Sequence, residues 1–157
     1  MLTRMDFALA PDECRRRFAA AERVVLATVG ANGAPHVVPV TFALLSTDDG
    51  ADLIVVTVDH KPKRTTELQR LRNVRHRPRV SFLADHYSSD WQQLWWVRAD
   101  ASAVVLEDDE QAASAIDALV GRYEQYRLQR PAGPVISTRD PVGATRSMRA
   151  SAEEQPV

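Results

Sequence analysis

Residues 23–45 read RVVLATVGANGAPHVVPVTFALL and have the pattern of a β-hairpin. Arg23–Val29 is rich in β-branched residues, which favours a strand. Asn32-Gly33 follows and is the strongest short signal for a hairpin turn. Pro35–Leu45 is then the returning strand. Pro39 within it has no N–H to donate to a sheet, which indicates an edge strand or a bulge.

Further elements are expected on both sides of this hairpin. Three more strands and a short last strand are predicted at Leu53–Val58, Arg79–Asp85, Leu94–Leu106 and Gly133–Ser137. Helices are predicted at Asp12–Glu22, between Pro62 and Pro78, and at Glu107–Arg127. Because no helix separates the first three strands, we predict a mainly β, α+β protein with an antiparallel, closed or nearly closed barrel.

Length and composition limit the class of protein. The chain has 157 residues, of which 45% are hydrophobic and 26% charged, which is typical of one soluble domain. No apolar run is long enough to cross a membrane, and the N-terminus lacks the apolar segment of a secretory signal. The single cysteine, Cys14, excludes an intramolecular disulfide, so we expect a cytoplasmic protein. We predict one domain over residues 1–137 and a flexible tail over residues 138–157, which has no aromatic residue and no periodicity.

Positive charge is concentrated in one window. The whole chain has 20 basic and 21 acidic residues, but the window His60–Arg79 has eight Lys and Arg and only one acid, Glu67. In Thr57–Arg64 a strand ends, the chain turns and a helix follows, and such a junction suits a phosphate or carboxylate. A solvated basic helix face and a nucleic-acid-binding patch are the alternative interpretations.

The segment LWWVR, residues 94–98, places two tryptophans side by side. On a strand Trp95 and Trp96 point to opposite faces, so one can enter the core while the other meets a ligand or a partner subunit. Arg98 shares the face of Trp96 and could reach an anion; simple packing is the alternative role. The four histidines are not at metal-ligand spacing, and we predict no metal site. Since no nucleophile or phosphate-loop motif is present, a bound cofactor is the better source of chemistry.

Several segments together resemble a known family. RVVLATVGANGAPHVVPVTFAL, TVDHKPKR, RPRVSFLADHYSSDWQQLWWVRADASAVVL, RYEQYR and GPVI are similar to the pyridoxamine-phosphate-oxidase-like split-barrel proteins, and more closely to their actinobacterial F420-dependent branch. The resemblance covers residues 22–136. It implies a six-stranded antiparallel split β-barrel of the FMN-binding type. It also implies a homodimer with coenzyme F420, a deazaflavin that carries hydride, at the dimer interface.

The resemblance also implies site residues. Lys61 and Lys63 match the phosphate-binding basic pair of the family, with Arg64 as a third cation. Thr57, Val58 and Asp59 match the strand end that lines the ring. Pro39, Val40 and Thr41 match the neighbouring strand, whose backbone faces the ring. Trp96 and Arg98 match the positions that the second subunit approaches. Relatives usually end with an apolar strand and a tryptophan-containing segment. This chain has no tryptophan after Ile136, so we expect a shortened last strand.

The function implied by the resemblance is an F420-dependent oxidoreductase that transfers hydride to or from a small organic substrate. Three alternatives stay open: an FMN-dependent oxidoreductase on the same scaffold, a non-catalytic carrier of F420 or flavin, and a nucleic-acid-binding protein that uses the basic helix. The predicted partners are a second copy of the chain and a small-molecule substrate, with neither nucleic acid nor membrane.

Overall fold

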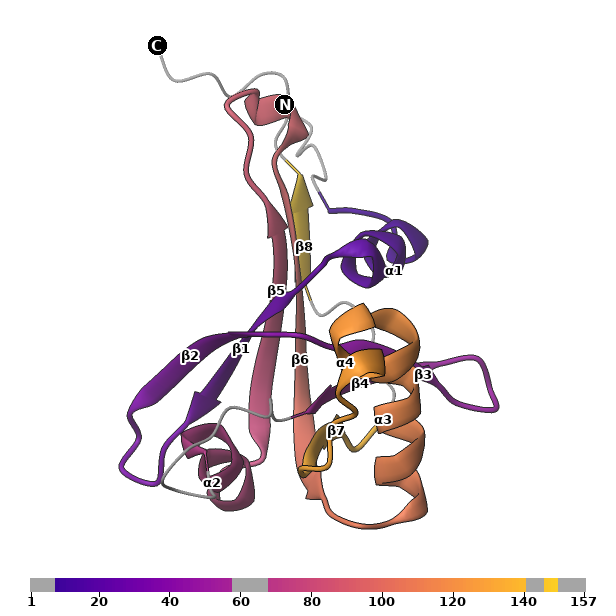
Figure 1. Cartoon of the computed structure of the whole chain (residues 1–157). Helices are drawn as coiled ribbons and strands as arrows, with labels where there is room; N and C mark the ends of the chain where they lie inside the picture. The colour runs from indigo at the N-terminus through magenta and orange to yellow at the C-terminus, as the bar shows by residue number, and fades with distance from the viewer. Residues whose placement is uncertain (1–7, 58–67, 141–145, 150–157) are drawn as a thin grey trace.

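The computed structural model describes residues 8–57, 68–140 and 146–149, the last for the backbone alone. One 3-10 turn, η1, lies at Trp91–Gln93. Figure 1 shows the other elements: α1 Pro11–Ala20, β1 Val24–Val29, β2 Pro35–Val40, β3 Ala43–Ser46, β4 Asp52–Thr57, α2 Gln69–His76, β5 Arg79–His86, β6 Trp95–Leu106, α3 Glu110–Arg122, α4 Glu124–Leu128, β7 Val135–Thr138 and β8 Arg146–Arg149.

All neighbouring strands are antiparallel, in the order β2-β1-β5-β6-β7-β4-β3, and β8 pairs with β6. The twelve-residue strand β6 joins the two halves of the sheet: its residues 95–102 pair with β5 and its residues 103–106 pair with β7. The prediction of an antiparallel α+β protein is confirmed. The expected closed or six-stranded barrel is not what the described residues form, because seven strands follow an open path and β2 does not pair with β3.

The predicted hairpin is present, but its returning strand is divided. Gly33 has a φ of 83°, the left-handed conformation that the turn requires. Val40 still pairs with Val24 of β1, whereas Ala43 pairs with Val55 of β4, so the chain changes partner at Thr41 and Phe42. The division makes two strands, β2 and β3, out of the one expected. Because these strands lie at opposite ends of the strand order, Thr41 and Phe42 connect the two edges of the sheet. Pro39 lies on an edge strand, as its missing N–H predicts.

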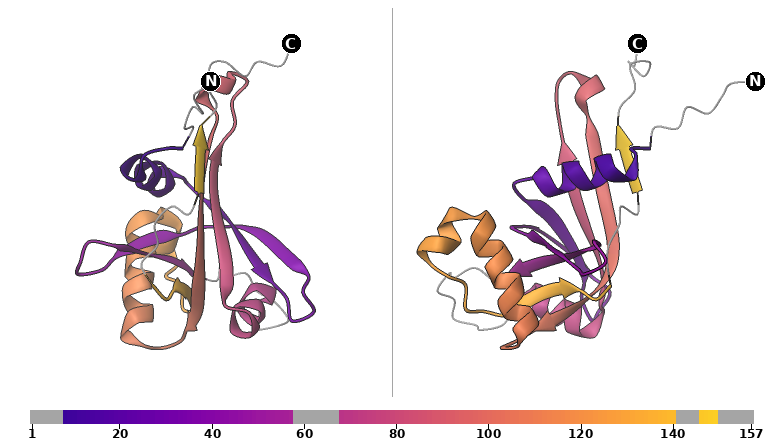
Figure 2. Two further views of the ribbon diagram at one scale, coloured as in Figure 1. Left: turned by 180° about the vertical axis from the view of Figure 1, so that it is seen from behind. Right: turned by 90° about the vertical axis from the view of Figure 1, so that its right-hand side faces the viewer.

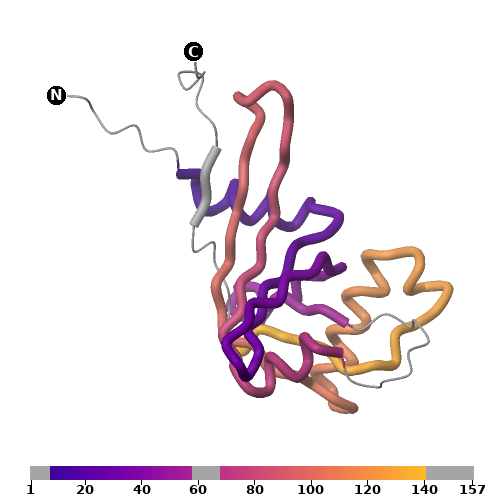
Figure 3. The backbone as a smooth tube through the Cα atoms, turned by 90° about the vertical axis from the view of Figure 1, so that its left-hand side faces the viewer, coloured from indigo at the N-terminus to yellow at the C-terminus, as the bar shows by residue number. Residues whose placement is uncertain are grey.

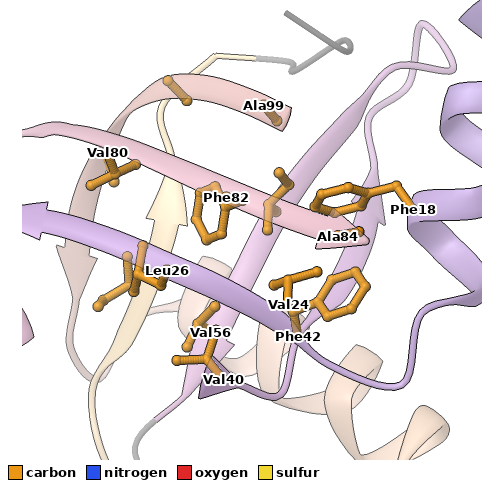
Figure 4. Close-up of a cluster of buried hydrophobic side chains, with 14 of the residues drawn as sticks. Phe18, Val24, Leu26, Val40, Phe42, Val56, Val80, Phe82, Ala84 and Ala99 are labelled. Atoms are coloured by element: carbon orange, nitrogen blue, oxygen red, sulfur yellow. The ribbon is translucent and has the colours of Figure 1, made fainter. Parts of the chain in front are cut away.

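The concave side of the sheet holds the main core (Figure 4). Val24, Leu26, Phe42 and Phe82 are at most 1% exposed, and they pack with small residues of β5 and β6. Phe18 of α1 meets Phe42 edge to face, with the ring centroids 5.2 Å apart. Both α1 and α2 add side chains to this cluster and therefore pack against the inner side of the sheet.

The outer side of the sheet is covered over only part of its area. The helices α3 and α4 lie beside β4 and β7 (Figure 2), and a second cluster of buried residues fills that contact. On the other half, the outer residues of β1, such as Val25 and Ala27, are half-buried, and Val37 of β2 is 61% exposed. The described helices thus leave the outer face of β2, β1, β5 and β6 without a partner layer.

The β5–β6 hairpin extends beyond the other described strands and helices (Figure 3). The strand β8 pairs with its β6 side, from Trp95↔Arg149 to Arg98↔Arg146. We expected a flexible tail from residue 138 onward; instead Thr138 completes β7 and residues 146–149 form a strand. Pairing of four backbone residues with an open strand edge needs no apolar periodicity, so the pattern of the sequence did not reveal it. Of the described helices, the longest has 13 residues, and none combines the length and apolarity of a membrane crossing.

Candidate functional site

The predicted basic turn lies largely outside the described residues. Val58, Asp59, Lys61, Lys63 and Arg64 all belong to that part of the chain. The elements on either side of it are described: β4 ends at Thr57 before the turn, and α2 begins at Gln69 after it. The two described ends that the turn connects are therefore fixed by how these two elements are held.

The helix α2 is attached to β1 through a buried amide. Asn73 is 1% exposed; its Nδ2 donates to Thr28 Oγ1 at 2.9 Å, and its Oδ1 accepts from Gln69 Nε2 at 2.7 Å. Leu71 and Val74 of the same helix enter the main core. A polar side chain that is buried and hydrogen-bonded on both sides specifies one position for the helix. The amide fixes the helix end that follows the basic turn.

Thr57 is the last described residue before that turn, and its hydroxyl is unusual. The residue is 3% exposed, and Oγ1 has no hydrogen-bond partner among the described residues. Because side chains alternate along a strand, Thr57 lies on the same outer side as Val55, which packs under α3. A buried hydroxyl without a partner costs free energy, so this position suits a polar ligand atom.

Thr41 lies on the same outer side, at the division between β2 and β3. Its Oγ1 is 2.6 Å from the hydroxyl of Tyr126 of α4. The neighbouring Tyr123 hydroxyl donates to Glu22 O at 2.8 Å and accepts from the Phe42 amide at 3.2 Å. The pairing of β3 with β4 ends at Ala43↔Val55, and Thr41 and Thr57 each lie two residues beyond this last pair. Two of the predicted cofactor residues are thus brought together.

The other two residues predicted on this strand face different ways. Pro39 is exposed on the outer side, next in line to Thr41. Val40 is 6% exposed and packs into the main core, so only its backbone is available to a ligand. Pro39, Thr41 and Thr57 therefore all lie on the outer side of the sheet, and this set of residues is named here the threonine face.

Arg98 and Trp96 lie at a distance from the threonine face. Pro39 pairs with Val25, Val25 with Leu83 and Leu83 with Arg98, so Arg98 is three strands away, at about 14 Å. Trp96 is half-buried, whereas Trp95 packs against the main core and lies between the side chains of Arg17 and His86. The two tryptophans thus point to opposite faces, as predicted.

The guanidinium of Arg98 already has an anion. Its Nη2 donates to Asp100 Oδ2 at 3.0 Å, and Ser81 Oγ donates to Asp100 Oδ1 at 2.6 Å. The hydrogen bond from Ser81, followed by the contact with Arg98, lowers the pKa of the Asp100 carboxyl below its ordinary value. Arg98 therefore reaches a ligand only through the part of its guanidinium that Asp100 does not occupy.

Sequence reasoning missed the tyrosines as site residues. RYEQYR served only as part of the family signature, yet Tyr123 and Tyr126 are the residues that hold the division between β2 and β3. The resemblance places His36 on the strand beside the ring but gives its side chain no role, and its Nδ1 is buried without a hydrogen-bond partner among the described residues. In that same part of the chain, no three His, Cys, Asp or Glu side chains are grouped as metal ligands would be.

A comparison with family sequence profiles identifies the chain. Residues 10–148 match the profile of the family described as pyridoxamine 5'-phosphate oxidase. The chain belongs to this family. The matched range includes the threonine face, the basic turn, both tyrosines and the first three residues of β8. A search of curated proteins gives no significant match.

The solved structures that share this fold have names that refer to different bound groups or to none. A conserved hypothetical protein of Mycobacterium tuberculosis is 19% identical, with a TM-score of 0.70; the match covers 100% of this chain and 95% of that one. A heme binding protein of Mycobacterium smegmatis is 21% identical, with a TM-score of 0.63 and coverage of 98% and 57%. A FAD-binding protein of Mesorhizobium loti is 18% identical, with a TM-score of 0.54 and coverage of 92% and 96%. At these identities the similarity establishes the fold alone.

Proposed function

We propose that this protein is an F420-dependent oxidoreductase whose cofactor lies on the threonine face, with its acidic groups at the basic turn. The observation that carries the proposal is the buried Thr57 hydroxyl, which has no hydrogen-bond partner among the described residues and comes shortly before Lys61, Lys63 and Arg64 in the sequence. Such a hydroxyl fits the polar edge of a flavin-like ring. Coenzyme F420 would supply hydride transfer, which the side chains of the chain do not offer.

Each part of the site has a binding role in this proposal. Thr57 and Thr41 would form hydrogen bonds to the ring, and Pro39 would offer it an apolar surface. Lys61, Lys63 and Arg64 would bind phosphate and carboxylate groups, and Val58 and Asp59 join these cations to the strand. Thr57 ends strand β4, and Thr41 is hydrogen-bonded to Tyr126 between β2 and β3, so both side chains would be ordered before the ring binds.

The number of cations favours F420 over FMN. One phosphate, as in FMN, needs one or two cations, whereas the lactyl-oligoglutamate tail of F420 adds several negative charges. The chain has three cations at the turn, with Arg70 and Arg72 on α2 behind them. A flavin is the second candidate, because a FAD-binding protein is among the structures that share the fold.

A second copy of the chain is part of the proposal. Trp96 and Arg98 lie on the outer face of β6, across the uncovered half of the sheet from Pro39. A partner subunit packed there would place these two residues near a cofactor held between the copies. Within one chain, Trp96 and Arg98 lie at a distance from Thr57. The proposed interface would instead let these two residues reach a cofactor that is bound to the other copy.

A fluorescence titration with F420 and with FMN tests the cofactor. We expect F420 to bind more tightly than FMN, and Lys63→Glu to weaken F420 binding by roughly one to two decades, since a charge-assisted contact is worth about 1.5–3 kcal/mol. Tighter binding of FMN by the wild type would contradict the F420 assignment and favour the flavin enzyme. Consumption of reduced cofactor with a panel of electrophilic substrates would separate an enzyme from a carrier.

Arg139→Glu is the matched control for charge reversal. Thr57 pairs with Val135, and Arg139 lies four residues farther along the chain, about 13 Å from the strand end. We expect this variant to bind F420 as the wild type does. Equal losses in both variants, or none in Lys63→Glu, would show that the basic turn is only a solvated surface.

A further inference from the structure

A second hollow adjoins the threonine face and is not used by the proposed cofactor. It encloses about 780 Å³ between the end of α1, the start of β1 and the junction of α3 with α4. Thr41 belongs to both places, since its side chain lines this hollow as well. The lining residues are Ala20, Glu22, Arg23, Thr41, Arg122, Tyr123, Gln125 and Tyr126.

Aromatic rings and a backbone carbonyl, and no carboxylate of the described residues, hold the Arg122 guanidinium in this hollow. The guanidinium lies 4.3 Å from the centroid of Phe42 and 5.4 Å from that of Tyr123, and its Nη2 donates to the carbonyl of Ala21. Among the described residues it takes part in no ion pair. A guanidinium that is already ordered by two rings loses little entropy on binding an anion, and its planar fork matches a carboxylate.

The rest of the lining is consistent with a negatively charged ligand. Arg23 is exposed and also makes no ion pair with a described residue, so the hollow has two cations against one acid, Glu22. The Thr41 and Tyr126 hydroxyls, 2.6 Å apart, add polar contacts for ligand oxygens, and the ring of Tyr123 adds an apolar wall. Charge, fork geometry and ring surface thus converge on one chemistry, an organic carboxylate.

We propose that this hollow binds the carboxylate of the substrate, so that the substrate class is an organic acid. The inference rests on the proposed function for its catalytic meaning, because Thr41 is what links the hollow to the face assigned to the cofactor. The carboxylate would be held by Arg122, with Arg23 beside it, and the rest of the molecule would extend past Thr41 toward the cofactor. The binding itself needs no cofactor, so it can be measured separately.

Benzoate and its neutral analogue benzamide are the probes, titrated into the full chain and followed by NMR chemical shifts. We expect benzoate to bind at least tenfold more tightly than benzamide. Arg122→Gln should weaken benzoate binding about tenfold or more, the effect of losing one charge-assisted contact. Arg139→Gln removes the same charge at an unrelated place and should change nothing.

Arg23→Gln keeps the test decisive if Arg122→Gln folds poorly. Arg23 is exposed and packs against no aromatic ring of the described residues, so its loss should weaken benzoate binding without lowering the melting temperature. Equal binding of benzoate and benzamide, or unchanged benzoate binding in both variants, would overturn the inference. An F420 titration distinguishes the two proposals: F420 binding without benzoate binding refutes only this inference, and the reverse refutes only the cofactor assignment.

Discussion

Asp100 is the ionisable residue whose environment is best defined on the open half of the sheet. Its carboxylate accepts from Ser81 on the adjacent strand and from Arg98 on its own strand. Both contacts favour the charged form and lower its pKa from the ordinary value of 3.8. A carboxyl with a lowered folded-state pKa stabilises the protein above its ordinary pKa, and that contribution is lost as the pH falls through the lowered value.

The variant Asp100→Asn should therefore cost stability in a pH-dependent way. Between pH 5 and pH 7 we expect a constant loss of roughly 1 kcal/mol, modest because the side chain is partly solvated. The difference from the wild type should shrink as the pH falls below about 4. Urea unfolding at several pH values measures it. A difference that stays the same down to pH 3 would show that the carboxylate contributes through its shape and not its charge.

At the scale of elements, α2 is the first described element after the basic turn. Its N-terminal residue carries no side-chain cap, and its first turn has no acid, so local signals do little to fix it. The Asn73 amide and the two apolar residues Leu71 and Val74 hold it instead. Because the proposed phosphate contacts come directly before this helix, loosening α2 should affect both stability and cofactor binding.

We expect Asn73→Ala to lower the free energy of unfolding by about 1–3 kcal/mol, because it leaves the buried Thr28 hydroxyl without its donor. F420 affinity should fall with it, although Asn73 itself does not contact the proposed ligand. His76→Ala at the exposed end of the same helix is the control and should change stability by less than about 0.5 kcal/mol. Denaturant unfolding and the cofactor titration give the two readings; a stability loss in His76→Ala equal to that in Asn73→Ala would contradict the anchoring role.

The strands were predictable because local patterns decide them, whereas the breaks between elements depend on distant contacts. Arg79–Asp85 and Leu94–Leu106 were predicted as strands, and β5 and β6 begin and end within one residue of these limits. The segment Glu107–Arg127 was expected as one helix, but it divides at Tyr123, whose hydroxyl bonds to Glu22 and Phe42 far along the chain.

The candidate site was predictable to a similar degree. Thr41 and Thr57 followed from the family resemblance, and the structure sets them on one surface. Tyr126 and Arg122 could not be found in the same way, because helical spacing alone does not show which strand a helix meets. Their roles depend on how α3 and α4 pack across β3 and β4, a contact between residues about 80 positions apart.

At the scale of the whole molecule, the uncovered half of the sheet and the projecting hairpin both favour the same binding partner, a second copy of the chain. The described helices leave the outer face of β2, β1, β5 and β6 uncovered, and Val37 on its edge strand β2 is 61% exposed. The hairpin that continues this face has Tyr87 and Trp91 exposed near its end, in a turn ordered by Asp90 through Gln92 N and Gln93 Nε2. An ordered apolar surface that is left open is typical of an interface, and two-fold dimers are the commonest assembly.

Val37→Asp tests this interface without disturbing the core, since the side chain points away from it. By sedimentation velocity at micromolar concentration we expect the wild type to be a dimer and Val37→Asp to be largely monomeric, because a buried, unpaired carboxylate in each copy opposes association. Leu128→Asp is the matched control: Leu128 is 85% exposed on α4, away from this face, and the variant should stay dimeric. If the cofactor lies between the copies, Val37→Asp should also weaken F420 binding with unchanged circular dichroism. A monomeric wild type, or a Val37→Asp variant that associates as tightly as the wild type, would remove the partner subunit from the proposed site.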